Sequence, residues 1–311
     1  MPCVSLVKGD NRYQNVTKAL EMIRKVVKPE NLNNKSFIIK PNLVSDSNPL
    51  AVTHVDAVRA VVDFIRSYNP EEIIIAEATA EGNTEEAYRR FGYDRLEGVR
   101  LLDVNKDDYE MIVIRTLKGG KRNIRVSKTI LNTDFKVSVA RAKTHDHVSC
   151  TLTLKNMMGS VPHIDHVWMH GAEEEPTSPI DRAIESNYVL INNLVTVVKR
   201  VGVDLGIVDG LEGMEGNGPV NGTRVNFGLA AAGIDCVAVD SVMASAMGFD
   251  PRLKGDTFLA DEEGLGISDL KSIEVIGEDL DKVRIKFKPH DNYYETQLQW
   301  TKHHPSARAY N

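Results

Sequence analysis

The stretch that decides the fold runs from residue 36 to residue 78, and it contains SFIIK (36–40), VDAVRAVVDFIRSY (55–68) and EIIIAEA (72–78). The first and third segments are short, continuous apolar runs, which are typical of strands that are buried on both faces. The middle segment places apolar residues three or four positions apart, as an amphipathic helix does. The order of strand, helix and strand predicts a β-α-β unit, and therefore a parallel sheet.

The same alternation continues along most of the 311 residues. Strand-like and helix-like segments take turns in CVSLV (3–7), VTKALEMIRKVV (16–27), TEEAYRRFGYDRL (84–96), VRLLDV (99–104), DFKVSVARAKTH (134–145), DRAIESNYVLINNLVTVVKRV (181–201), VDLGIVDG (203–210) and DCVAVDSVMASAMGF (235–249). One segment differs, because YEMIVIRTLKGGKRNIRV (109–126) has two extended runs around a Gly-Gly pair, as a hairpin does. We therefore expect an α/β fold with a mainly parallel β-sheet flanked by helices and an inserted or appended β-hairpin.

The sequence indicates the domain boundaries less clearly than it indicates the strands. We expect one domain over residues 1–290, or two lobes over 1–135 and 136–290, followed by a polar C-terminal tail over 291–311. The acidic, proline-containing run GAEEEPTSP (171–179) is typical of a mobile loop.

Composition excludes several classes of protein. The chain has 38 Lys and Arg against 44 Asp and Glu, and this net charge of -6 argues against nucleic acid or an anionic membrane as a partner. No run of apolar residues is long enough for a membrane span, and the first residues do not have the pattern of a signal peptide. Cys3, Cys150 and Cys236 are few and widely spaced, which favours a reducing compartment and makes an iron-sulfur cluster unlikely on chemical grounds. We predict a cytoplasmic protein.

Polar side chains stand where the predicted strands end, at Lys40, Glu77, Lys143 and Asp209, with Asn42 just beyond the first. The carboxyl ends of parallel strands share one edge of a sheet, where open α/β folds bind their ligands. A buried lysine must either be paired or face an anion, because an unpaired ammonium is costly to desolvate. We favour the second alternative, and predict that Lys40 and Lys143 face an anion in this crevice, with Asn42 and Glu77 beside it.

A glycine-rich run, DGLEGMEGNGPVNG (209–222), follows the last of these strands. The backbone at Gly216, Asn217 and Gly218 could approach the same ligand closely, or the run could be a tight surface turn. The carboxylates of Asp209 and Glu215 would suit a divalent cation, or they could orient the lysines.

Residues 148–155 alternate strictly between apolar and polar, as in a half-buried strand, although a helix beginning after residue 146 is the competing interpretation. In either case Lys155 and Asn156 follow closely after the strand that carries Lys143, and could fold back to the same crevice.

Histidines are concentrated nearby. His145 lies close to two lysines in the sequence, which would lower its pKa and keep it neutral, as a general base requires. His163, His166 and His170 would share a helix face, and the last two have a spacing that can hold a metal, or the segment could be solvated or gate the ligand. His147 is expected at the surface.

Four motifs resemble the successive signatures of the domain-of-unknown-function 362 family. They are IIKPNLV (38–44), ARAKTHDHVSCTLTLKNMMGSVP (140–162), VDGLEGMEGNGPVNG (208–222) and AAGIDCVAVDSVMASAMGFDP (231–251). Some members of that family carry a ferredoxin-like module with two four-iron clusters, which implies redox chemistry for them. This sequence lacks the clustered cysteines of that module, so the resemblance implies only the shared core and its Lys, His, Asn and Asp positions.

Together these patterns predict an enzyme that binds an anionic small molecule, a carboxylate or a phosphate. Lys40, Lys143 and Lys155 would hold its charge, Asn42 and Asn156 would hydrogen-bond it, and His145 would move a proton. Isomerase, lyase and ligase chemistry all fit this set, and racemisation of a hydroxy acid is one concrete case. The alternative is a non-catalytic accessory protein that binds a metal, a cofactor or a redox partner. A homo-oligomer is compatible with both.

Overall fold

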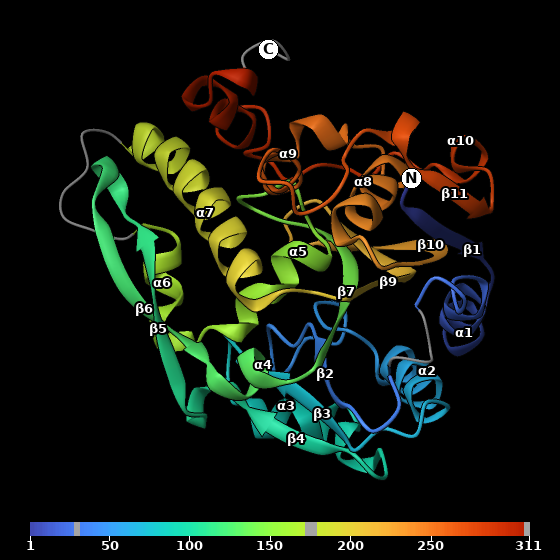
Figure 1. The fold of residues 1–311 in the computed structure, drawn as a ribbon. Helices are drawn as coiled ribbons and strands as arrows, with labels where there is room; N and C mark the ends of the chain where they lie inside the picture. The colour runs from blue at the N-terminus through green and yellow to red at the C-terminus, as the bar shows by residue number, and fades with distance from the viewer. Residues whose placement is uncertain (28–31, 172–178, 308–311) are drawn as a thin grey trace.

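The computed structural model describes residues 1–27, 32–171 and 179–307, and a nine-stranded sheet runs through the molecule (Figure 1). In sheet order the strands are β11 (Glu274–Gly277), β1 (Cys3–Lys8), β10 (Thr223–Gly233), β9 (Leu205–Glu215), β7 (Phe135–Thr144), β2 (Ser36–Pro41), β3 (Glu72–Glu77) and β4 (Arg100–Asp103), with β8 (Cys150–Thr151) beside β7. Five of the eight strand pairings are parallel and three are antiparallel. The predicted α/β fold with a mainly parallel sheet is confirmed.

Helices cover both faces of this sheet. They are α1 (Arg12–Met22), α2 (Val55–Arg66), α3 (Thr84–Arg90), α4 (Lys128–Asn132), α5 (Thr153–Asn156), α6 (His166–Met169), α7 (Pro179–Val201), α8 (Cys236–Ala246), α9 (Gly255–Glu262) and α10 (Leu280–Val283). Side chains alternate along β2, so Phe37 and Ile39 pack with α1 and α2, whereas Ile38 packs with α7 on the other face. Burial on both faces explains why the strand is a continuous apolar run.

The predicted hairpin forms a separate two-stranded sheet of β5 (Tyr109–Arg115) and β6 (Lys121–Ser127). It extends along α7, at the left of Figure 1. Asn193 of α7 is fully buried there, where its side chain accepts from the Arg115 backbone N–H and donates to the Arg115 carbonyl, both at 2.9 Å. A buried amide on the long helix therefore completes the edge of the hairpin.

Asp209 was predicted at the end of a strand, but it does not lie there. Strand β10 pairs antiparallel with β9, and this pairing extends β9 to Glu215, so Asp209 lies inside the strand. The glycine-rich run is consequently the end of β9 and its connection to β10. The sequence predicts where β9 begins, but not that β10 pairs with it. This antiparallel pairing lets β9 continue through Gly210 and Gly213.

Three other segments can be compared with the predictions. Residues 148–155 contain both of the predicted alternatives, since β8 covers Cys150–Thr151 and α5 begins at Thr153. Residues 291–307 pack against the domain rather than extending from it, with the Trp300 side chain buried and its indole N–H donating to the Leu253 carbonyl at 3.0 Å. Residues 172–178 of the predicted mobile loop lie outside the described residues. No helix in the described ranges is both long and apolar enough to cross a membrane.

Candidate functional site

A cavity of about 220 Å³ opens where β2, β3 and β7 end. Eight of the residues singled out from the sequence line it: Asn42, Glu77, His145, Lys155, Asn156, His163, His166 and His170. They come from segments that are far apart in the chain, and the shared edge of the parallel strands brings them together. The ends of these three strands therefore meet at one cavity.

Lys40 lies behind the cavity wall and is fully buried. Its ammonium donates to Glu77 Oε2 at 2.6 Å and to the Pro41 carbonyl at 2.7 Å. The same carboxylate accepts from the Leu43 and Ala78 backbone N–H groups, both at 2.8 Å. Burial lowers the pKa of Lys40, and Glu77 opposes that shift. Lys40 is therefore paired with a carboxylate and does not face an anionic ligand.

Gly159 explains how this ion pair fits beneath the cavity. A Cβ atom at this position would lie 1.8 Å from Glu77 Oε1 and 2.5 Å from Lys40 Cε. The chain therefore passes over the ion pair at a distance that only glycine allows. The sequence analysis did not single out this residue.

Lys143 is also buried, but its partners are neutral oxygens. Its ammonium donates to Asn42 Oδ1 at 2.8 Å and to the Ala51 carbonyl at 2.6 Å. Burial, followed by repulsion from Lys155 and Arg141, holds its pKa well below the ordinary value for lysine. Lys143 does not line the cavity, and it reaches the site only through the side chain of Asn42.

Asn156 joins the strands beneath the site. Its amide nitrogen donates to the Lys40 carbonyl at 2.7 Å and to Ser138 Oγ at 3.0 Å, which uses both of its hydrogens. Its oxygen lies 3.3 Å from Asn42 Nδ2 and 3.4 Å from Lys40 Nζ. These contacts fix the two asparagines and the two lysines relative to one another.

Lys155 is the lysine that faces the cavity. Among the described residues its ammonium contacts Met158 Sδ at 3.2 Å, and no carboxylate of the described chain lies within ion-pairing distance of it. Burial lowers its pKa to about 8, and Asp146 and Asp256 limit the shift. A thioether is a weak acceptor, so this ammonium retains hydrogen-bonding capacity that a ligand could use.

The short helix α5 that carries Lys155 is held by Asp240 of α8. Asp240 Oδ1 accepts from the Thr153 backbone N–H at 2.7 Å and from the Thr153 hydroxyl at 2.5 Å. Lys254 donates to Asp240 at 3.3 Å and to Asp256 at 2.6 Å, and all three ionic side chains are fully buried. A four-residue helix would be marginal alone, so this buried network is what positions Lys155.

Burial lowers the pKa of three of the histidines that line the cavity, namely His145, His166 and His170. His166 Nε2 lies 2.9 Å from the Val161 carbonyl, and burial lowers the pKa of this imidazole to about 3. His170 follows α6, and burial holds its pKa well below the ordinary value. Burial also lowers the pKa of His145 to about 3, with Lys155 contributing and Asp146 opposing. All three imidazoles are therefore neutral at pH 7.

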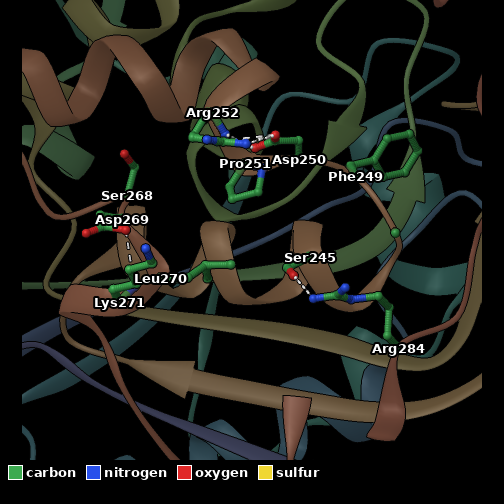
Figure 2. A pocket seen from close by; sticks show the side chains of 11 residues that line it. Ser245, Phe249, Asp250, Pro251, Arg252, Ser268, Asp269, Leu270, Lys271 and Arg284 are labelled. Atoms are coloured by element: carbon green, nitrogen blue, oxygen red, sulfur yellow. Dashed lines mark hydrogen bonds and ion pairs between the residues drawn. The ribbon is translucent and has the colours of Figure 1, made fainter. Parts of the chain in front are cut away.

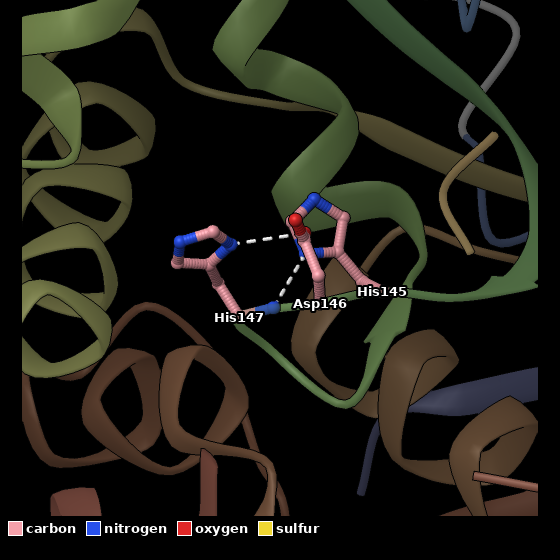
Figure 3. A group of neighbouring side chains, drawn as sticks. All are labelled: His145, Asp146 and His147. Carbon is pink, nitrogen blue, oxygen red and sulfur yellow. Dashed lines mark hydrogen bonds and ion pairs between the residues drawn. The ribbon is translucent and has the colours of Figure 1, made fainter. Parts of the chain in front are cut away.

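Asp146 and His147 were not predicted as site residues, yet they lie beside His145 (Figure 3). Asp146 Oδ1 lies 3.0 Å from His145 Nδ1 and 2.9 Å from His147 Nδ1. The ring of His147 lies 4.5 Å, between centroids, from that of His170. His147 is partly buried at the site rather than simply at the surface. The His-Asp-His run in the sequence is the signal that could have found this cluster.

The remaining predicted residues lie elsewhere. Asp209 forms an ion pair with Arg12 at 2.8 Å, and Glu215 Oε2 accepts from the Lys288 backbone N–H at 2.8 Å. Asn217 Nδ2 donates to Asp291 at 2.8 Å, and a Cβ at Gly218 would lie 2.1 Å from the Thr144 carbonyl. None of these residues, nor Gly216, lines the cavity, although Pro219 does.

A larger cavity of about 530 Å³ lies along α8 (Figure 2). Its two arginines have partners, since Arg252 pairs with Asp250 and Arg284 donates to Ser245 Oγ at 2.9 Å. None of the residues singled out from the sequence lines it. We place the candidate site at the smaller cavity, because that is where buried titratable groups from separate strands meet.

Comparison with known proteins agrees with the motifs. The sequence matches the domain of unknown function DUF362 over residues 38–245. The chain belongs to this family. A thylakoid-associated protein of Synechocystis sp. is 27% identical over 233 residues, which cover 74% of this chain and 68% of that protein.

Two solved structures are also similar. The lactate racemase apoprotein of Thermoanaerobacterium thermosaccharolyticum is 17% identical, with a TM-score of 0.49, over 75% of this chain and 54% of that one. A protein from Thermotoga maritima is 10% identical, with a TM-score of 0.46, over 74% of this chain and 57% of that one. The chain thus spans little more than half the length of either structure.

Proposed function

We propose that this protein is an enzyme that binds a small carboxylate in the 220 Å³ cavity and transfers a proton to and from it. The observation that supports the proposal is the position of Lys155, which lines the cavity and whose ammonium contacts a thioether but no carboxylate among the described residues. Bringing an unpaired ammonium out of water costs free energy, and an anionic ligand would offset that cost. A cavity of this size suits a substrate smaller than most drug-like ligands.

Lys155 can serve both binding and proton transfer, because its pKa is about 8. At neutral pH most molecules carry the ammonium, which attracts the anion, and a minority carry the free amine, which can accept a proton. An acid-base group is most effective when its pKa lies close to the working pH.

The neighbouring residues narrow the class of substrate. Lys40 is neutralised by Glu77, and Lys143 is screened by Asn42, so a single ammonium faces the cavity among the described residues. One positive charge favours a carboxylate over a phosphate dianion. Asn42 donates one amide hydrogen to Asn156, which leaves its second for the substrate. Asn156 uses both of its amide hydrogens in the protein, so its role is to position the others.

The reaction that this arrangement suits is isomerisation at the carbon next to the carboxylate, as in racemisation of a hydroxy acid. After the substrate binds, the Lys155 ammonium releases a proton to solvent. The C–H bond then breaks, its proton passes to the resulting amine, which becomes an ammonium again, and the electron pair is delocalised onto the carboxylate oxygens, which the second amide hydrogen of Asn42 can hydrogen-bond. Return of a proton to the opposite face inverts the carbon. His145, which lines the same cavity, is the second candidate for proton transfer, as predicted from the sequence. A cytoplasmic location belongs to this proposal, on the basis of the few, unclustered cysteines.

Deuterium exchange tests the proposal. The protein is incubated in D₂O with short 2-hydroxy and 2-amino carboxylates, and NMR records loss of the proton next to the carboxylate. We expect exchange with at least one of these compounds, abolished in Lys155→Met and retained in Lys282→Met, since Lys282 is 81% exposed. Absence of exchange and of carboxylate binding, or equal exchange in both variants, would contradict the proposal.

A further inference from the structure

The loop between β7 and β8 brings three potential metal ligands to one point. One ligand atom from each of His145, Asp146 and His147 lies within 4.8 Å of the others. Figure 3 shows the carboxylate of Asp146 between the two imidazoles. Consecutive side chains of an extended strand would point to opposite faces, so this convergence depends on the loop.

The contacts inside the cluster are short without all being hydrogen bonds. His145 Nδ1 accepts from the His147 backbone N–H at 3.0 Å, yet Asp146 Oδ1 also lies 3.0 Å from this nitrogen. Two acceptors in contact repel unless a cation lies between or beside them. His147 Nδ1 lies 2.9 Å from the same oxygen, but within the described chain it is buried without a hydrogen-bond partner. Asp146 Oδ1 thus lies within 3.0 Å of the Nδ1 atoms of both imidazoles.

The loop is held in this shape from outside. Asn292 donates to the Asp146 carbonyl at 2.8 Å, and Gln297 donates to the His145 carbonyl at 2.8 Å. Gln297 Oε1 also accepts from the Ser149 backbone N–H at 2.7 Å, where Ser149 has a φ of 63°. Residues from the C-terminal segment thus fix a conformation that the loop would not be expected to keep alone, which is how outer residues support metal ligands.

We propose that His145, Asp146 and His147 bind a divalent first-row transition metal ion at the edge of the cavity. Two imidazoles and one carboxylate are a donor set found for zinc and for non-haem iron. Asp146 Oδ1 lies 3.0 Å from His145 Nδ1 and 2.9 Å from His147 Nδ1, separations that fit bonds of about 2.1 Å at right angles, and the three ligand atoms lie within 4.8 Å of one another. The Asp146 side chain is 38% exposed, which gives the ion a route from solvent.

Three protein ligands leave coordination positions open toward the cavity, where a carboxylate could bind. The metal would then stabilise the charge that develops on the carboxylate when Lys155 takes the proton, and His145 would serve as a metal ligand instead of as the second proton-transfer group. This role rests on the proposed function, whereas the metal site itself does not.

Cobalt binding tests the site directly. Metal-free protein is titrated with Co²⁺, and both calorimetry and visible absorption are recorded. We expect one Co²⁺ per chain, and affinity reduced by more than about 100-fold in both Asp146→Asn and His147→Asn. His163→Asn is the matched control, because His163 is an exposed histidine at the same cavity, and we expect it to leave the affinity unchanged. Circular dichroism checks that each variant is folded.

Lys155→Met separates this inference from the proposed function. We expect this variant to retain Co²⁺ affinity while it loses carboxylate exchange. The metal site would be overturned if the wild-type protein did not bind Co²⁺, or if binding survived in Asp146→Asn and His147→Asn. Neither result would bear on the Lys155-dependent exchange, which the deuterium experiment tests.

Discussion

Lys40 and Lys155 are close neighbours in the fold, but their partners differ completely. Lys40 is buried against Glu77 and two further acceptors. Lys155 lines the cavity, and within the described chain its ammonium contacts only the sulfur of Met158. Burial lowers the pKa of both lysines, so the pKa does not separate them. The difference lies in hydrogen bonding, and it teaches that the first lysine supports the site while the second is available to a ligand.

The largest expected effect is on stability, at Lys40. Lys40→Met leaves the buried carboxylate of Glu77 without its cation, and we expect the free energy of unfolding to fall by about 3–5 kcal/mol. Urea denaturation followed by circular dichroism measures this change. The double variant Lys40→Met with Glu77→Gln should recover part of the loss. A loss below about 1 kcal/mol in the single variant would remove the structural role of the pair.

Lys155 should behave in the opposite way. Lys155→Met removes an ammonium that has no carboxylate partner, so the free energy of unfolding should stay the same or rise. Affinity for a small carboxylate such as glycolate should fall about 100-fold, since a charge contact with the ligand is lost. Calorimetry and urea denaturation on the same samples give both numbers. Destabilisation as large as in Lys40→Met would show that Lys155 has the same structural role as Lys40.

Gly159 tests how tightly the chain covers the Lys40–Glu77 pair. Gly159→Ala would place a methyl group 1.8 Å from Glu77 Oε1, and we expect a loss of about 1–3 kcal/mol in the free energy of unfolding. The same substitution in a Glu77→Asp background should cost less, because the shorter side chain withdraws the oxygen. Equal costs in the two backgrounds would mean that the contact is not the cause.

The pH dependence of ligand affinity gives the smallest effect. Only the ammonium form of Lys155 attracts an anion, so affinity should be constant below pH 8 and fall about tenfold per pH unit above it. The charged groups that bear on this lysine are Asp146, Asp256, Lys40 and Glu77. Lys155→Arg should bind with no such fall, because arginine stays protonated. A wild-type profile that stays flat up to pH 10 would assign the binding charge to another residue.

Much of the framework could be predicted from the sequence, because apolar runs and helical periodicity report burial directly. The sequence predicts SFIIK and EIIIAEA as strands of one parallel sheet, and the convergence of Asn42, Glu77 and His145 follows from the shared edge of such a sheet. The pairing of Lys40 with Glu77 could not be predicted in the same way. It depends on which strands are adjacent and on the close passage of Gly159, and both are tertiary facts.

Asp209 shows the other limit of the sequence. Its position after an apolar run suggested a strand end, but an antiparallel neighbour extends the strand, and Arg12 takes the carboxylate. The cluster at Asp146 and His147 was missed for a related reason, since adjacent residues of an extended segment normally diverge. Here the loop between β7 and β8 is held by a hydrogen bond from Gln297, far along the chain, and its shape brings these side chains together.

Titration of Lys155 itself tests the central claim most directly. Lysine side chains are labelled with ¹³C at Cε, and the Lys155 signal is assigned by its absence from Lys155→Met. We predict that it titrates near pH 8 in the free protein and at a higher pH when glycolate is added, because a bound anion stabilises the ammonium. A Lys155 signal that titrates near the ordinary value for lysine and does not respond to glycolate would contradict the account.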